Sequence, residues 1–249
     1  MRLILILLSL TSISSYGQLP KIAVDWEREI IEQFDTLDIN ESNVYDFAEI
    51  LLNQLRIDRD PWSTYIGVFG PLNRRIDFHL QATKIFDEKY SVLGKSKIGD
   101  SIGELSGMIY LRRIVQTPWD VSILLFKYIL KKPENKDGNG FFTGIGSVVF
   151  KIENDKPKMY WNEAGEFRDF NNMFVGIWNR YNSDISKECI FSFNPSGTHN
   201  KLPYRDYLYK EFQEEDECKC YFEIKNEFRQ YGWENYDDSN EYKDYWWRK

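Results

Sequence analysis

Histidine is the side chain best suited to proton transfer near neutral pH, and this chain has two of them. His79 follows Phe78 in an apolar stretch, and His199 follows the turn residues Gly197 and Thr198. The two histidines are far apart in the sequence. A Ser-His-Asp triad or a two-histidine metal site would therefore require the fold to bring distant residues together, and no local motif indicates that it does. Gly-x-Ser-x-Gly, His-Glu-x-x-His and phosphate-loop motifs are absent from the sequence. We therefore assign no catalytic residue, no metal ligand and no cofactor.

Carboxylates leave one enzymatic class open. Glycosidases need two carboxyl groups with no fixed separation in sequence. Glu163 and Glu166 follow Tyr160 and Trp161 in the sequence. Asp58 and Asp60 precede Trp62. A solvated hairpin edge and a salt-bridged turn account for the same residues. A carboxylate-dependent glycan hydrolase is therefore kept as an alternative function.

The three cysteines, Cys189, Cys218 and Cys220, all fall in the last quarter of the chain. In an oxidising compartment, a disulfide from Cys189 to Cys218 or Cys220 is expected. Such a bond would stabilise the fold by about 3 kcal/mol through loop closure. The Cys-x-Cys spacing differs from the spacing of zinc ligands, so these residues predict no metal site.

Aromatic residues make up 16% of the chain, with eight tryptophans and sixteen tyrosines. Exposed aromatic rings stack on sugars or anchor protein partners, whereas a thick core would bury the same residues. We take four tryptophans as candidate binding residues: Trp161, Trp178, Trp246 and Trp247.

The N-terminus has the order of a secretory signal peptide. Arg2 precedes an apolar run over residues 3–10, and small residues, Ser15 and Gly17, stand at −3 and −1 of a cleavage site. The run is shorter than the roughly 20 apolar residues of a membrane-spanning helix. We expect residues 1–17 to be removed and the protein to be exported to the periplasm or the extracellular space.

The net charge argues against some partners. The chain carries 32 basic and 39 acidic residues, a net charge of −7. Binding to nucleic acid or to an anionic membrane requires a basic surface, so neither is expected as a partner. No segment after the N-terminal run is apolar enough to span a membrane.

Helical spacing dominates the first part of the sequence. Apolar residues recur at intervals of three and four over residues 25–37 and 43–57, which predicts an antiparallel helical hairpin. The same spacing over residues 78–93, followed by Gly94, predicts a third helix.

Strand patterns follow. Residues 108–115, 121–130, 142–152 and 158–161 are rich in β-branched and aromatic residues, with turn signals between them. Further strands are expected at 174–180, 190–193 and 218–224, and a short helix at 223–231.

Helices first and strands afterwards predict an α+β fold in which the helical hairpin packs on an antiparallel meander. Leu51 and Leu55 should then face a sheet that contains four core residues: Ile123, Leu125, Val149 and Trp161.

One segment resembles a known family. Residues 174–178 (Phe-Val-Gly-Ile-Trp) and 191–198 (Phe-Ser-Phe-Asn-Pro-Ser-Gly-Thr) are similar to the opening of lipocalin-like small barrels, from Gly176 to Thr198. About fifty residues follow this segment, too few for the roughly eight strands of that family. The resemblance therefore implies a related strand-turn-strand unit and carries over no binding residues. An ordinary hairpin with a buried Trp178 fits the same pattern.

Residues 18–249 are predicted to form a single composite domain, with a boundary near residue 170 as the alternative. The predicted function is a secreted or periplasmic, non-catalytic binding protein for a glycan, a small ligand or a protein. A periplasmic inhibitor of the immunity type is a second alternative, beside the glycan hydrolase.

Overall fold

The computed structural model describes residues 19–37, 45–52, 64–134, 139–160, 172–192, 204–211, 218–234 and 246–248. For residues 35–37, 204–211 and 218–223 it describes the backbone alone. The predicted signal peptide therefore lies outside the described residues.

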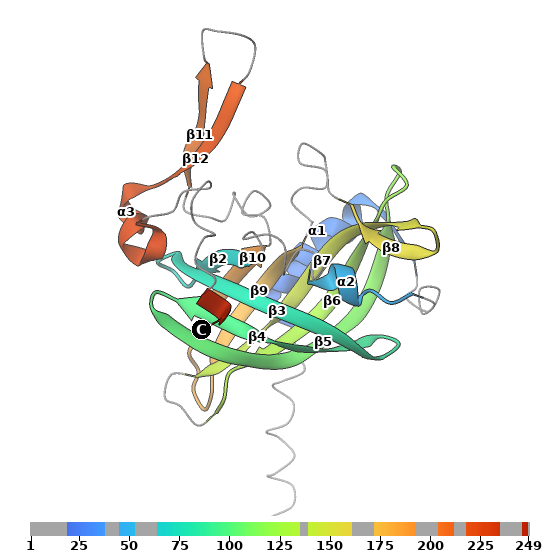
Figure 1. Cartoon of the computed structure of the whole chain (residues 1–249), viewed down its shortest axis with the longest axis horizontal. Coiled ribbons are helices and arrows are strands. Elements are labelled where there is room, and N and C mark those ends of the chain that lie inside the picture. The colour runs from blue at the N-terminus through green and yellow to red at the C-terminus, as the bar shows by residue number, and fades with distance from the viewer. Residues whose placement is uncertain are drawn as a thin grey trace, which may run out of the picture.

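The central feature is a sheet of antiparallel strands that closes on itself (Figure 1). Each strand pairs with the next one along the chain, and the last, β10, pairs with the first, β2. The closing strands are β2 (Tyr65–Phe69), β3 (Arg74–Phe86), β4 (Lys89–Ile98), β5 (Ser101–Gln116), β6 (Ser122–Lys131), β7 (Gly140–Glu153), β9 (Met173–Arg180) and β10 (Ser186–Ser192). We call this unit the closed sheet. Closure leaves these eight strands without a free edge.

Three further pairings extend this arrangement. Strand β1 (Asp35–Leu37) pairs with the end of β5, and β8 (Lys156–Met159) pairs with the end of β7. The turn between β7 and β8 consists of Asn154 and Asp155, both with positive φ, as a two-residue hairpin turn requires. Strands β11 (Tyr204–Glu211) and β12 (Cys218–Ile224) form a separate two-stranded sheet.

The interior of the closed sheet is filled with side chains. Because side chains alternate along a strand, every second residue points inward. Phe174 and Phe191 stack with their ring centroids 4.5 Å apart, and Phe191 also stacks on Phe78. The largest interior side chains are each at most 1% exposed: Tyr65, Phe78, Tyr90, Phe126, Tyr128, Phe142, Phe174 and Phe191. This aromatic filling leaves no room for a ligand along the axis of the closed sheet.

A short helix, α2 (Ala48–Leu51), lies at the end of the closed sheet where β3 turns into β4. Phe47 packs edge-on against Phe150, and its backbone N–H donates to the hydroxyl of Tyr90 at 3.1 Å. Leu51 is fully buried in the interior cluster. This end is therefore covered by apolar side chains.

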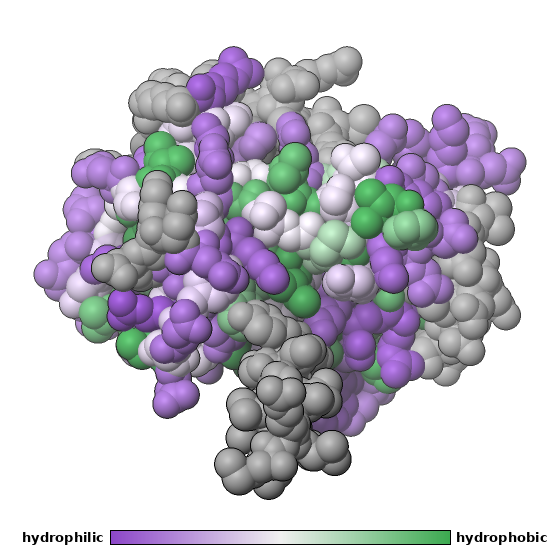
Figure 2. Space-filling model, turned by 90° about the horizontal axis from the view of Figure 1, so that it is seen from below, coloured by the Kyte–Doolittle hydropathy of each residue, from purple (hydrophilic) through white to green (hydrophobic). Residues whose placement is uncertain are grey.

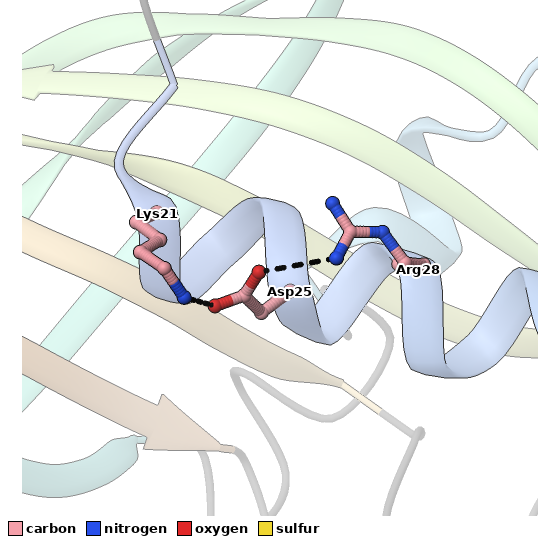
Figure 3. A network of polar contacts seen from close by, with 3 residues as sticks. All are labelled: Lys21, Asp25 and Arg28. Carbon is pink, nitrogen blue, oxygen red and sulfur yellow. Dashed lines mark hydrogen bonds and ion pairs between the residues drawn. The ribbon is translucent and has the colours of Figure 1, made fainter.

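Helix α1 (Lys21–Gln33) covers part of the outside (Figure 1). Its Ala23 and Ile30 pack against Ile123, Leu125 and Val149 of β6 and β7. Glu27 on the same helix accepts two hydrogen bonds from the Arg112 guanidinium, at 2.9 and 3.1 Å. The exposed side of α1 carries Lys21, Asp25 and Arg28, which form ion pairs with one another (Figure 3).

The C-terminal segment packs on the outside as well. Helix α3 (Asn226–Phe228) continues into a π-helical turn, η6 (Arg229–Trp233), in which Gly232 has a φ of 97°. The indole of Trp233 is fully buried and donates to the carbonyl oxygen of Asn73. The last described element is a 3-10 helix, η8 (Trp246–Arg248).

The predicted α+β fold is wrong. Of the predicted helix over residues 43–57 the structure describes residues 45–52, in which the helix α2 has four residues. The predicted helix over residues 78–93 is instead part of the hairpin of β3 and β4. Helix α1 lies outside the closed sheet rather than in a helical hairpin, and Gly94 lies inside β4 rather than at a helix end. The apolar residues in 78–93 fit both periods. They recur at helical spacing, but Phe78, Leu80 and Ala82 also follow the period of two that a strand requires, and all three are buried.

The later strands agree better with the prediction. The predicted strands 108–115 and 142–152 lie in β5 and β7, and the predicted strand 121–130 lies in β6 except for Val121. The short helix expected at 223–231 is shorter, with a π-helical end. Helix α1 packs on Ile123, Leu125 and Val149, as expected of the first predicted helix. The predicted packing of Leu51 on these residues is wrong, because Leu51 belongs to the interior cluster. Leu55 and Trp161 lie outside the described residues.

Candidate functional site

The end of the closed sheet opposite α2 carries a cavity of about 290 Å³. Strands β2, β4, β6 and β9 end here, and β3, β5, β7 and β10 begin here, because consecutive strands run in opposite directions. Its wall is made by residues at those strand ends: Phe69, Ile98, Lys132, Phe142, Trp178, Arg180, Ile185 and Lys187. We call it the mouth cavity.

A row of side chains across three strands forms one wall of the mouth cavity. Phe142 of β7 is the register partner of Trp178 of β9, and Trp178 is the partner of Lys187 of β10. The Lys187 ammonium lies 5.2 Å from the ring centroid of Phe69 and 5.8 Å from that of Trp178. Both rings thus present a face to a cation, an attractive arrangement.

Three cations line the mouth cavity, and its lining includes no aspartate or glutamate. Each cation continues a series of inward-facing residues past the apolar core: Lys132 follows Tyr128 and Leu130, while Arg180 follows Trp178. The chain as a whole is acidic, so this concentration of positive charge is local. An anion that enters the cavity would meet a favourable potential.

Lys132 is the most enclosed of the three cations. Its side chain lies over Gly103, with Nζ 3.4 Å from the position that a Cβ on residue 103 would occupy. Its backbone is fixed by a hydrogen bond from its N–H to the carbonyl oxygen of Gly140 and by the Tyr181 hydroxyl, which donates to its carbonyl oxygen. Burial lowers the pKa of Lys132, and nearby Cys189 opposes that shift.

A wider groove of about 620 Å³ adjoins the mouth cavity on the outside, and Lys132 lines both. Trp247 of η8 lies at this groove and stacks on His79, with ring centroids 5.0 Å apart and an interplanar angle of 9°. Charges of both signs line it, among them Lys95 and Glu104. We call it the outer groove, and we regard it as a less selective surface than the mouth cavity.

Exposed apolar side chains are scattered over several turns and strands, for example Phe86, Trp119 and Ile152. Seen from below, the described surface is largely hydrophilic with separate hydrophobic patches (Figure 2). Isolated exposed apolar residues are normal on protein surfaces and do not indicate a partner. The mouth cavity is therefore the better candidate for recognition.

The four candidate tryptophans have different surroundings. Trp178 lines the mouth cavity and is 7% exposed. Trp246 and Trp247 are buried where η8 docks on the closed sheet, and Trp161 lies outside the described residues. The structure thus brings one of the four to the cavity, with a second, Trp247, at the outer groove.

The predicted disulfide needs a correction. Cys189 is a free thiol inside the closed sheet, and it is fully buried. It sits between Gly176 of β9 and Phe69 of β2, its register partners, so surrounding strands enclose it. Burial raises the pKa of this thiol, which keeps it protonated and unreactive. For Cys218 and Cys220 the structure describes the backbone alone.

The structure does not test the carboxylates on which the glycan hydrolase alternative depends. Asp58, Asp60, Glu163 and Glu166 lie outside the described residues, as does His199, and His79 packs under Trp247. Within the described ranges, no group of three histidine, cysteine or acidic residues could hold a metal ion. No helix in the described part of the chain is long and apolar enough to cross a membrane.

Sequence reasoning missed the three cations of the mouth cavity. Counting inward positions along each strand would have found them, because Lys132, Arg180 and Lys187 all occupy the inward phase of their strands. The sequence feature that indicates such a site is a basic residue at an inward-facing position, two residues from a buried aromatic or apolar residue of the same strand.

Comparison with protein-family models, with curated proteins and with solved structures finds no match to this chain. Its function is therefore inferred from the geometry of the mouth cavity alone.

Proposed function

We propose that this protein binds small amphipathic anions in the mouth cavity: a carboxylate attached to one aromatic ring or to a short aliphatic chain. The observation that carries the proposal is that Lys132, Arg180 and Lys187 surround aromatic walls with no acidic residue in the lining. Apolar walls with a few placed polar groups are the usual composition of small-molecule sites.

The size of the ligand follows from the filled interior. A volume of about 290 Å³ lies at the lower end of ligand pockets. Phe142 and Trp178 close the cavity toward the core, so a long acyl chain cannot extend along the axis. A single ring or a short chain fits, with its anionic group toward Arg180 and Lys187 at the rim.

The shape and charge of the mouth cavity favour a ligand-binding protein over the two alternatives. A concave site with basic lining suits a small anion better than the flat acidic patch expected of an immunity-type inhibitor. The hydrolase alternative depends on carboxylates that lie outside the described residues. If residues 1–17 are a signal peptide, the binding takes place in an extracytoplasmic compartment.

The proposal is tested by calorimetric titration with benzoate and with benzamide, its neutral isostere. We expect benzoate to bind more tightly and its affinity to fall with added salt. Lys187→Gln and Arg180→Gln should each weaken benzoate binding about tenfold, as expected for a lost charge-assisted hydrogen bond.

The matched control is Lys158→Gln on β8, which lies outside the cavity lining and should leave benzoate affinity unchanged. Equal affinities for benzoate and benzamide, or equal effects of the three substitutions, would overturn the proposal.

A further inference from the structure

Lys132 differs from the other two cations of the mouth cavity in its depth. Arg180 and Lys187 are exposed at the rim, whereas Lys132 is partly buried between the mouth cavity and the outer groove. No ion pair joins Lys132 to a carboxylate among the residues that the structure describes. Its ammonium is therefore enclosed without a neutralising partner in this part of the chain.

Such surroundings favour the neutral amine. Burial lowers the pKa of Lys132, and nearby Cys189 opposes that shift without cancelling it. A desolvated lysine beside other cations is the usual setting of lysines that form Schiff bases. The nearest comparison is Lys131, the preceding residue, which is exposed and lines the outer groove but not the mouth cavity.

Lys132 lines both the mouth cavity and the outer groove, so a ligand in either can reach its side chain. Gly103 of β5 lies under the end of the Lys132 side chain, where the nearest atoms to an added Cβ would be Nζ at 3.4 Å and Cε at 3.6 Å. These are ordinary van der Waals distances, so the end of the Lys132 side chain packs along β5 at Gly103.

We infer that Lys132 is a covalent attachment site for carbonyl compounds, namely aldehydes or 2-oxo acids that also carry an anionic group. This inference rests on the proposed function, because the same rim cations that bind the anion place the carbonyl group next to Nζ. The neutral amine attacks the carbonyl carbon and forms a C–N bond, and the carbonyl oxygen takes up a proton as the nitrogen loses one. Loss of water from this carbinolamine leaves a C=N bond, and no oxidant or reductant is consumed.

The test uses 4-formylbenzoate with cyanoborohydride, which reduces an imine to a stable amine that peptide mass spectrometry can locate. We expect Lys132 to be labelled at least about tenfold faster than Lys131, because the cavity that binds the carboxylate holds the aldehyde beside the Lys132 amine. Lys132→Arg should remove this fast labelling, whereas Lys131→Arg, the matched control, should retain it. Circular dichroism confirms that both variants are folded.

A labelling rate at Lys132 equal to that at Lys131 in the unaltered protein overturns the inference, and that result needs no variant to fold. Protection by benzoate separates the two proposals. Benzoate that binds, as measured by calorimetry, while Lys132 stays unlabelled refutes the attachment site alone. Fast labelling of Lys132 that benzoate fails to slow supports the reactive amine and refutes the anion site.

Discussion

The ammonium of Lys187 lies 5.8 Å from the ring centroid of Trp178, its register partner on the neighbouring strand. This pairing places a cation and an indole in the same wall of the mouth cavity. A ligand that reaches Lys187 must therefore change the surroundings of Trp178. Because Trp178 is also packed into the interior cluster, truncating it to alanine would disturb the fold, and binding is better tested by substitutions of the cations.

The first prediction concerns the ion pair between α1 and the closed sheet. Glu27→Gln should lower the free energy of urea unfolding by about 1–3 kcal/mol, because a buried carboxylate loses its charge-assisted bonds to Arg112. Asp25→Asn on the exposed side of the same helix should cause no measurable loss, since surface ion pairs contribute little. Equal losses in the two variants would show that the Glu27 pair does not fasten the helix.

The second prediction concerns Tyr90, whose hydroxyl accepts a hydrogen bond from the Phe47 N–H beside α2. Tyr90→Phe should cost about 1–3 kcal/mol at pH 7, because a buried N–H loses its acceptor. Tyr110→Phe on the outer side of β5 is the control and should cost little.

The same residue gives a pH dependence. Burial raises the pKa of Tyr90 to about 12, from an ordinary value of 10.0. The unfolded chain therefore loses this proton first, and stability should fall as the pH rises from 10 toward 12. In Tyr90→Phe the fall should be shallower, and an identical slope in urea unfolding would contradict the assignment. Tyr65, Tyr128 and Cys189, whose pKa values are also raised by burial, contribute to the fall in stability in both proteins.

The third prediction concerns the close approach of β7 and β9. A Cβ on Gly176 would lie 2.2 Å from the carbonyl oxygen of Thr143 and 2.6 Å from the hydroxyl of Tyr128. Gly176→Ala should therefore destabilise the protein by about 1–3 kcal/mol or more through overpacking. Gly103→Ala is the matched control, since its Cβ would meet only the flexible end of Lys132. Similar thermal midpoints for the two variants would show that the strands can separate freely at Gly176.

The fourth prediction concerns export. If Ser15 and Gly17 mark the cleavage site, the mature chain begins at Gln18. Intact mass spectrometry of the protein from the culture medium or the envelope fraction should give the mass of residues 18–249. A mass that retains Met1 would contradict cleavage.

Local strand structure could be predicted from the sequence where a single pattern was present. In β6, Ile123 and Leu125 face out toward α1 while Leu124 and Phe126 face in, so the segment is apolar on both faces, and it was predicted as a strand. Over β3 and β4 the apolar residues satisfy the helical period and the strand period at once, so the spacing alone does not distinguish a helix from a strand. The alternation of buried residues from Ile76 to Ala82 is the feature that indicates the strand.

Closure of the sheet could not be predicted in the same way. It depends on the pairing of β2 with β10, where Val68 meets Ile190, and no local pattern encodes a contact at such sequence separation. The mouth cavity depends on that closure, because it gathers the ends of strands from the whole closed sheet. Trp178 was named from the sequence, but the three cations around it became visible only with the topology.

Benzoate binding in the mouth cavity can be followed at Trp178 itself, by titration monitored through the indole N–H resonances of the tryptophans in two-dimensional NMR. We expect the Trp178 resonance to shift and saturate with benzoate, while that of Trp119, on the β5–β6 turn at the other end of the closed sheet, stays in place. In Lys187→Gln the Trp178 shift should require a higher benzoate concentration. A Trp178 resonance that does not move while benzoate binds would place the anion site elsewhere and contradict the account.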